Sequence, residues 1–322
     1  MTDKTEGIAM HYIDDEFLKS EERNGYFVSA EMKKLWAIEL GCLEQLQHIC
    51  QKHGLRYFAA SGTLLGAVRH HAFIPWDDDM DFWMPAEDYK KFCDIAPQEL
   101  EEPYFFRNFE TDYRYSADFS CICNGNTTFI TQYDQQYISD DYRCCISIDV
   151  FPLQGIQDNF VLRLKQKLLA LFLKYAIYGY RRQKNNLTNG KYCFRDKVNV
   201  RVIYWNLIKR FMDINALYKK YLTVCNSGGS NSNEVTLVSY WNFKHIFKRR
   251  WFKEIIDIPF ERGTLPCPYE YDNVLKAEYG DWRIPKITGG DHVRVLFDAE
   301  MSCKEKIKVL KSNRQCKLIS NK

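Results

Sequence analysis

The chain has 322 residues, of which 46% are hydrophobic and 27% charged, so it is neither too short nor too polar to bury a core and fold on its own. Its net charge of +3 is unevenly spread, because residues 161–220 hold 15 Lys and Arg against 2 Asp and the rest of the chain is acidic overall. The longest apolar run, 168–173, is far shorter than the roughly 20 residues of a membrane-spanning helix.

The chain begins with a polar segment, residues 1–29, which shows no apolar stretch typical of a secretory signal. Apolar residues at three- and four-residue spacing then predict a helix over 31–52, which ends near Gly54. Residues 55–60 are expected to form a short buried strand. Together these elements open a predicted catalytic core that extends over residues 30–160.

A turn of small residues follows, beginning with Ser61, Gly62 and Thr63, and it leads into a short helix. Gly62 permits a close approach of the backbone, and Thr63 is expected to cap the helix, so the exposed N–H groups suit a phosphate. A Ser-Gly-Thr turn is also a common structural cap. These residues alone leave both interpretations open.

Four aspartates then fall within five positions: Asp77, Asp78, Asp79 and Asp81. Asp79 and Asp81 precede an apolar stretch at the spacing of alternate residues in a strand, which predicts that both carboxylates point the same way. Oxygen ligands that converge in this way suit a hard cation such as Mg²⁺, as in phosphoryl-transfer sites. The alternative for an isolated acidic triplet is a solvated loop.

Beyond the aspartates, Pro85 is expected at the first position of a helix that runs toward Pro97. Further strands are predicted over 104–109, 115–123 and 144–151. The last of these contains Asp149 between apolar neighbours, where a carboxylate is unfavourable unless it is paired or binds a metal. Asp149 is therefore the natural third carboxylate of the site.

Residues 161–225 form a basic helical region, which indicates either an anionic partner, such as a phosphate-rich glycan or a membrane surface, or a pair of solvated amphipathic helices. No recognised nucleic-acid-binding motif accompanies this charge, so nucleic acid is not expected as a partner. A polar loop, 226–233, follows; residues 234–300 are expected to complete the catalytic domain, and 301–322 to form a peripheral helix and tail.

The 12 cysteines include no pair with the C-x₂-C spacing of a zinc site. We interpret most of them as small core residues in a reducing compartment. The predicted location is the cytoplasm, at the inner face of the membrane if the basic region contacts it.

Residues 61–70 (SGTLLGAVRH) and 73–81 (FIPWDDDMD) closely resemble the signature of the LicD family, and 148–153 (IDVFPL) and 258–285 fit the same pattern. That family contains bacterial phosphocholine transferases and is related to the fukutin-type proteins, which transfer alditol phosphates to glycans. The resemblance implies an α+β fold with a nucleotidyltransferase-like mixed sheet and surrounding helices, to which this chain adds the basic helical insert.

By this resemblance, Ser61, Gly62 and Thr63 contact the donor phosphates and Asp79 and Asp81 form the metal pair, with Asp149 as the third acid. Arg69 is a candidate phosphate clamp or a structural ion pair. Asp77 is a further candidate metal ligand, and the role of Asp78 stays open. Mg²⁺ is the expected ion, with Mn²⁺ as the alternative, and Asp149 either completes the metal site or accepts the acceptor's proton.

The implied reaction is metal-dependent transfer of phosphocholine, or a related alcohol phosphate, from a CDP-activated donor to a hydroxyl of a cell-surface glycan. The acceptor would be a lipopolysaccharide, teichoic acid or capsule precursor, either lipid-linked or phosphate-bearing. The first alternative is a nucleotidyltransferase that acts on a small molecule or sugar. The second is a non-catalytic glycan-binding module whose aspartates bind Ca²⁺.

Overall fold

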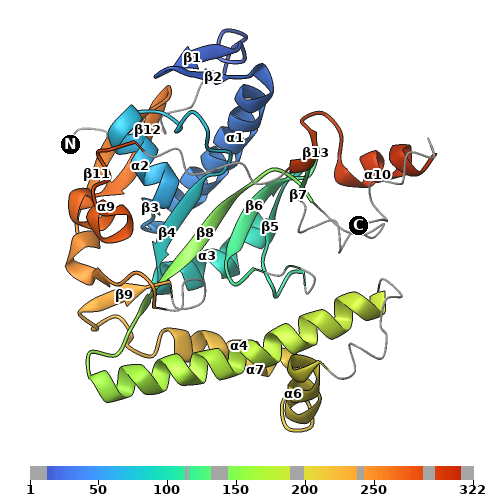
Figure 1. Ribbon diagram of the computed structural model, residues 1–322, viewed down its shortest axis with the longest axis vertical. Helices are drawn as coiled ribbons and strands as arrows, with labels where there is room; N and C mark the ends of the chain where they lie inside the picture. Colours follow the sequence, from blue (N-terminus) through green and yellow to red (C-terminus); the bar gives the residue numbers. More distant parts are fainter. Residues whose placement is uncertain are drawn as a thin grey trace.

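The computed structural model describes residues 13–112, 115, 117–131, 144–188, 199–237, 243–285 and 294–312. A mixed β-sheet with helices packed around it forms the larger part of the molecule, and a group of helices lies beside one end of it (Figure 1). The predicted α+β class with a mixed sheet is confirmed.

The helices are α1 (Ala30–His53), α2 (Ser61–His70), α3 (Ala86–Glu99), α4 (Phe160–Thr188), α6 (Val200–Ile208), α7 (Ile214–Cys225), the 3₁₀-helix η2 (Arg249–Phe252), α9 (Tyr271–Tyr279) and α10 (Cys303–Ser312). The strands are β1 (Glu21–Arg23), β2 (Tyr26–Val28), β3 (Phe58–Ala59), β4 (Asp81–Pro85), β5 (Tyr104–Arg107), β6 (Ser120–Asn124), β7 (Thr128–Thr131), β8 (Ser147–Gly155), β9 (Glu234–Thr236), β10 (Phe247–Lys248), β11 (Ile255–Phe260), β12 (Gly263–Pro268) and β13 (Arg294–Asp298).

Strand β8 is the centre of the main sheet, whose order is β10-β9-β8-β4-β3, with β6 also paired to β8 and β5 paired to β6. Its apolar residues, including Ile148, Val150 and Leu153, are buried. The pairing of β8 with β4 is parallel, while its pairings with β6 and β9 are antiparallel. The parallel pair sets Asp81 directly opposite Asp149, which brings two predicted site residues onto neighbouring strands.

Helix α1 supplies one buried layer against this sheet. The Ser29 hydroxyl accepts the N–H of Met32 at 3.1 Å, and Gly54 ends the helix in the left-handed conformation with φ of 62°. Trp36 and Leu43, at the spacing of one helix face, are fully buried in the main core. The prediction of a helix over 31–52 that ends near Gly54 is confirmed within a residue at each end.

Four expectations about local structure were wrong. The strand predicted over 55–60 is limited to Phe58–Ala59, and the one predicted over 115–123 begins only at Ser120. Pro85 ends β4 and is the N-cap of α3, one position before the predicted one. Thr63 does not cap α2, because Ala60 occupies the N-cap position.

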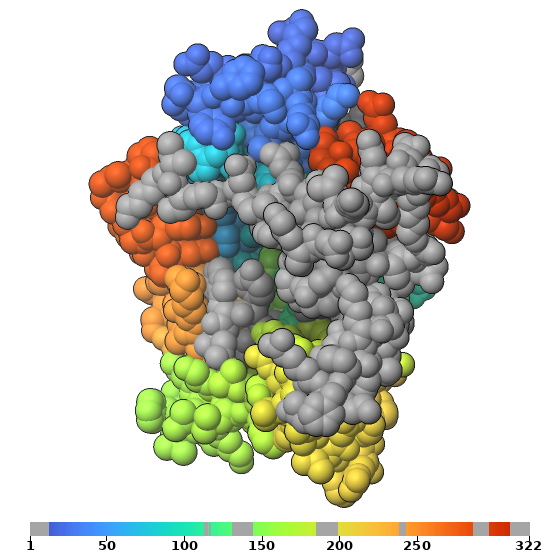
Figure 2. All heavy atoms as spheres, turned by 45° about the vertical axis from the view of Figure 1, so that its right-hand side comes forward, coloured from blue at the N-terminus to red at the C-terminus, as the bar shows by residue number. Residues whose placement is uncertain are grey.

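Helices α4, α6 and α7 confirm that the basic region is helical, although residues 189–198 lie outside the described part of the chain. They enclose a second, smaller core that includes Ile177, Trp205 and Tyr221. In the space-filling view of Figure 2 this helical group forms the end of the molecule opposite the N-terminal segment. Among the described residues, no helix is both long enough and apolar enough to cross a membrane.

The polar segments that follow these helices in the chain pack against the main sheet. The loop predicted over 226–233 is packed against the end of β8, where the Gly228 N–H donates to the carbonyl of Gly155 at 3.0 Å. Strands β9 and β10 then extend the main sheet. Of the predicted tails, residues 13–29 include the β1–β2 pair and 303–312 form α10, while 1–12 and 313–322 lie outside the described residues.

Gly179 allows α4 and α6 to approach closely, because a Cβ at this position would collide with the backbone carbonyl of Arg201 and come within 3.0 Å of the Trp205 side chain. We expect Gly179→Ala to lower the free energy of unfolding by about 1–3 kcal/mol through overpacking. Gly41→Ala is the matched control, since its Cβ meets only the movable Tyr104 side chain. Thermal unfolding should show a destabilised Gly179→Ala and an unchanged or stabilised control; equal melting temperatures would contradict the close packing.

Candidate active site

A residue of helix α1 holds the segment that carries Asp77, Asp78 and Asp79 in place. Trp36 donates its indole N–H to the carbonyl oxygen of Asp77 at 2.9 Å, and the Asp77 N–H closes a turn onto the carbonyl of Ile74 at 2.9 Å. Trp36 itself is fully buried and stacked on Phe73, with 4.6 Å between ring centroids. A rigid core residue therefore fixes the backbone of the loop that carries the acidic side chains.

The strand pair β4–β8 positions the next two acids. Asp81 and Asp149 are register partners, and the Asp149 N–H donates to the carbonyl of Met80 at 2.9 Å. The hydroxyl of Thr63, on α2, accepts the N–H of Asp81 at 2.8 Å. Asp79 lies before the start of β4 at Asp81. The prediction that Asp79 and Asp81 are alternate residues of one strand is therefore wrong for Asp79.

Helix α2 opens toward this acidic loop. Its N-cap residue, Ala60, makes no side-chain capping hydrogen bond, so the first-turn N–H groups are not satisfied by a cap. Ser61 has an unusual positive φ of 43° for a residue with a side chain. A Cβ on Gly62 would collide with the Asp77 carboxylate, so glycine here makes room for an aspartate of the site itself.

These elements border a cleft of about 320 Å³, which we call the acidic cleft. It is lined by Ser61, Gly62, Leu65, Arg69, Ile74, Trp76, Asp77, Asp79, Asp81, Tyr279, Asp281, Trp282 and Ile284. Six of the predicted site residues thus share one cavity. Thr63 is buried, with its hydroxyl on Asp81, and its predicted contact with a donor phosphate stays a prediction.

The charges of the site strongly favour a cation. One carboxylate oxygen from each of Asp77, Asp78 and Asp79 lies within 4.8 Å of the other two. Burial, followed by the charges of Asp79 and Asp149, raises the pKa of Asp81 well above its usual value. An oxygen-only donor set under mutual repulsion fits a hard divalent ion, although the structural cluster includes Asp78, which the sequence left without a role.

Two carboxylates near the aspartates, Glu39 and Glu278, were not predicted from the sequence. Glu39, on α1, is 1% exposed, its Oε2 has no hydrogen-bond partner among the described residues, and burial followed by the charges of Asp79 and Asp78 raises its pKa strongly. Its position three residues after Trp36, inside the apolar face of α1, was the available signal. Glu278, on α9, has its pKa raised to about 7 by burial, with Ser61 as a hydrogen-bond partner.

Arg69 lines the acidic cleft, and its contacts bear on the two roles considered for it, a phosphate clamp and a structural ion pair. Its side chain donates to the His70 ring at 2.9 Å and to the carbonyl of Trp282 at 3.1 Å. It forms no ion pair with a carboxylate of the described residues, which disfavours a structural salt bridge. Burial lowers the pKa of the guanidinium. A positive charge at the rim of the acidic cleft is available to an anionic ligand.

Comparison with known proteins places the family resemblance on this part of the chain. Residues 54–154 match the model of the LicD/FKTN/FKRP nucleotidyltransferase domain, which confirms the predicted similarity over the segment that holds Ser61 to Asp149. Over 85 residues, a quarter of this chain, it is 44% identical to the lipopolysaccharide cholinephosphotransferase LicD of Haemophilus influenzae.

Two other relatives are uncharacterized proteins of Rickettsia. That of R. typhi is 41% identical over 69 residues, 21% of this chain, and that of R. prowazekii is 37% identical over 81 residues, 25% of this chain. The matched stretches span 31%, 22% and 29% of the lengths of the three relatives. The chain therefore matches less than a third of the length of each of these relatives, and the family model covers the part of the acidic cleft that lies within residues 54–154.

Proposed function

We propose that this protein, which carries a LicD-type nucleotidyltransferase domain over residues 54–154, transfers phosphocholine from a CDP-activated donor to a hydroxyl of a cell-surface glycan. The observation that carries the proposal is the acidic cleft, in which the uncapped start of α2 faces the aspartates of the loop and β4. The relative from H. influenzae is named for phosphocholine transfer to lipopolysaccharide, which supports this choice of group and acceptor.

The proposed division of labour follows from the positions of the side chains. The N–H groups at the start of α2, with Arg69 at the rim, would hold the donor phosphates, since a helix N-terminus and a guanidinium both favour anions. Asp77, Asp79 and Asp81 would hold Mg²⁺ or Mn²⁺, with Asp149 beside them. The bound ion would neutralise charge on the pyrophosphate. Transfer then depends mainly on how well the chain aligns donor and acceptor.

An acceptor hydroxyl must lose its proton during transfer, and a carboxylate beside the phosphates is the natural base. Asp149 and Glu278 both lie in the electrostatic field of the site. The pKa of Glu278, raised to about 7, is suited to proton transfer near neutral pH. We therefore propose Asp149 as a ligand or base and Glu278 as a second candidate for the base.

The walls of the acidic cleft favour choline over an uncharged alcohol. Trp76, Tyr279 and Trp282 all line the cleft. Aromatic faces attract quaternary ammonium groups, and the neighbouring carboxylates add to this attraction. Glycerol phosphate and ribitol phosphate carry no cation and would gain nothing from these rings. The aromatic lining thus supports phosphocholine as the transferred group.

We expect Trp76→Leu to lower kcat/KM for CDP-choline about tenfold, which corresponds to one cation–π contact of about 1.4 kcal/mol. The control is CDP-glycerol with the same two proteins, for which the loss should stay within about twofold. Steady-state release of CMP measures both. Equal losses with the two donors would mean that Trp76 shapes the cleft without recognising the ammonium group.

The helical group supplies a surface that suits a lipid-linked acceptor. Large apolar side chains are exposed along α4 and α6: Phe160, Val161, Leu162, Leu164, Leu168, Leu171, Phe172, Tyr175, Val200, Ile203 and Leu207. Exposed basic residues of the same helices, such as Lys165 and Arg182, flank them. Apolar residues beside cations are typical of helices that lie in the interface of an anionic bilayer. We propose that this face rests on the membrane.

The basic flank contributes less than the sequence suggested, because Arg181 is 4% exposed and pairs with Asp118 at 3.1 Å. We expect Leu164→Ser combined with Leu168→Ser to reduce flotation with phosphatidylglycerol vesicles several-fold. Phe27→Ser is the control, since Phe27 is 68% exposed on β2, outside this face. Unchanged flotation of the double variant, or a face that instead joins two copies in size-exclusion chromatography, would rule out the membrane contact.

A further inference from the structure

A second cavity, of about 560 Å³, lies at the opposite end of the β4–β8 pair from the acidic cleft, and we call it the basic pocket. Pro85 and Leu153, which are register partners, line the basic pocket, whereas Asp81 and Asp149 stand four residues earlier on the same strands. Four residues of strand span about 13 Å. None of the described residues lines both cavities, so the basic pocket is separate from the proposed transfer site.

Among the described residues, the basic pocket is lined by five basic side chains, Arg56, Lys248, Arg249, Arg250 and Lys253, and by a single acidic one, Glu87. Two of the five already have carboxylate partners: Arg56 pairs with Asp88 at 3.2 Å and Lys248 with Glu234 at 2.5 Å. Arg250 and Lys253 are exposed and form no ion pair with the described residues. The pocket therefore keeps an excess of positive charge.

Arg249 is the organised centre of the basic pocket. Its Nε donates to the Ser232 carbonyl at 2.6 Å, and its Nη2 donates to the Gly229 carbonyl at 2.6 Å and to the Ser232 hydroxyl at 2.7 Å. These bonds use one side of the guanidinium and leave Nη1 without a hydrogen bond to the described residues. Gly155 is required beneath it, since a Cβ there would come within 2.8 Å of Nη2.

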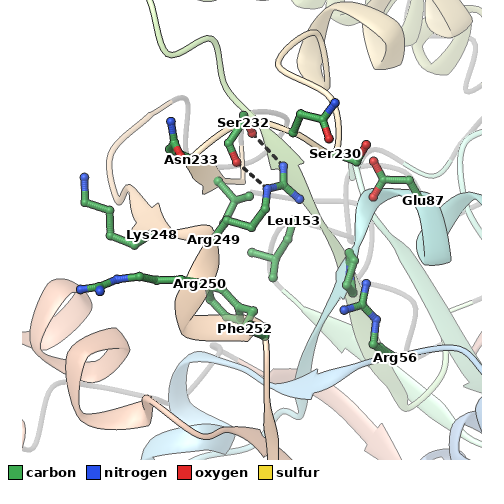
Figure 3. A pocket seen from close by; sticks show the side chains of 14 residues that line it. Arg56, Glu87, Leu153, Ser230, Ser232, Asn233, Lys248, Arg249, Arg250 and Phe252 are labelled. Atoms are coloured by element: carbon green, nitrogen blue, oxygen red, sulfur yellow. Dashed lines mark hydrogen bonds between the residues drawn. The ribbon is translucent and has the colours of Figure 1, made fainter.

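The surroundings of Arg249 combine positive charge with groups that bind hydroxyls. Figure 3 shows its guanidinium fixed on the Ser232 side, with Glu87, Ser230 and Arg56 around the remaining space. A carboxylate in a basic pocket repels a phosphate, but it accepts strong hydrogen bonds from sugar hydroxyls. Asn231 and Asn233 add further donors and acceptors. The cavity is also larger than a phosphate ion needs.

We propose that the basic pocket binds a phosphorylated sugar, with the phosphate on Arg249 and Arg56 and the hydroxyls on Glu87 and Ser230. Such a ligand uses both the excess of cations and the one carboxylate. A phosphate-bearing unit of a glycan and a free sugar phosphate share this chemistry. Binding here does not depend on the transfer reaction, so failure to bind a sugar phosphate would leave the proposed function intact.

Isothermal titration of the full chain with glucose 6-phosphate, glucose and inorganic phosphate tests the proposal. We expect saturable, salt-sensitive binding of glucose 6-phosphate, at least about tenfold tighter than that of either other compound. Arg56→Gln should weaken it about tenfold, while Lys220→Gln, the same charge change at an exposed site on α7, should leave it unchanged. No binding, or an equal loss in both variants, would overturn the proposal.

Glu87→Gln separates sugar recognition from simple attraction of anions. Loss of this charge should tighten the binding of inorganic phosphate and weaken that of glucose 6-phosphate, so the preference between the two falls several-fold. Thermal unfolding confirms that each variant is folded. If Glu87→Gln tightens both ligands equally, the basic pocket binds phosphate alone and the assignment to a sugar is wrong. Repeating the titration with methyl α-glucoside 6-phosphate distinguishes the two sources of the ligand, because its anomeric oxygen is blocked as in a glycan. Equal binding supports a phosphate-bearing glycan unit, and loss of binding restricts the site to free sugar phosphates.

Discussion

Asp81→Asn is expected to reduce CMP release from CDP-choline by about 10³-fold or more, since it removes a carboxylate that we propose holds a divalent ion at the donor phosphates. The same change should stabilise the metal-free protein. Asp81 is crowded by Asp79 and Asp149, and burial raises its pKa well above the usual 3.8. An acid whose pKa is raised by folding lowers stability as the pH rises from its unfolded pKa through its folded pKa.

The pH dependence provides the second readout. Without divalent ions, Asp81→Asn should gain stability relative to the wild type as the pH rises above about 4, because the aspartate ionises unfavourably in the folded protein and asparagine does not ionise. Mg²⁺ should raise the melting temperature of the wild type more than that of the variant. Asp94→Asn, an exposed carboxylate on α3, is the control and should change neither activity nor the response to Mg²⁺. Full activity in Asp81→Asn would remove Asp81 from the site.

Gly62→Ala is expected to lower activity about 100-fold with little change in stability. Gly62 has an ordinary helical backbone, so alanine is tolerated there, and the only severe conflict of its Cβ is with the Asp77 carboxylate. That side chain can swing away, which preserves the fold but displaces a proposed metal ligand. Misplacement of a positioning group by about 1 Å can reduce turnover about 100-fold.

A double-mutant cycle shows whether the effect passes through Asp77. In an Asp77→Ala background the collision is gone, so adding Gly62→Ala should cost little further activity, and the coupling between the two changes should be large. Gly41→Ala on α1 is the matched control and should be additive with Asp77→Ala. Additive losses from Gly62→Ala and Asp77→Ala would mean that glycine at position 62 serves another purpose.

The helices and strands that could be predicted are those whose start, end and buried face are all encoded within one short stretch of sequence. Helix α1 carries its apolar stripe, its Ser29 cap and its terminal Gly54 in one stretch of sequence, and its limits were predicted within a residue. The start of β4 was misjudged because tertiary contacts decide it. The Trp36 indole holds Asp77 in a turn, so the strand begins only at Asp81.

The acidic cleft could be predicted only in part, because some of its signals are local in the sequence and others are not. Its loop and α2 each contain recognisable motifs, so six of the thirteen lining residues could be named from the sequence. Glu39 and Glu278 were not named, because they approach the aspartates only through the packing of α1 and α9 around the sheet. The one local signal was the position of Glu39 inside the apolar face of α1. The basic pocket combines residues from 56 to 253, none of which forms a motif by itself.

Transfer from a CDP-activated donor is measured most directly by product analysis with CDP-choline, CDP-glycerol and CDP-ribitol in the presence of Mg²⁺, with water as a slow acceptor. We expect release of CMP, fastest from CDP-choline, and its loss with EDTA or in Asp81→Asn. Release of pyrophosphate from a nucleoside triphosphate instead, with no CMP from any CDP donor, would contradict it and identify a nucleotidyltransferase.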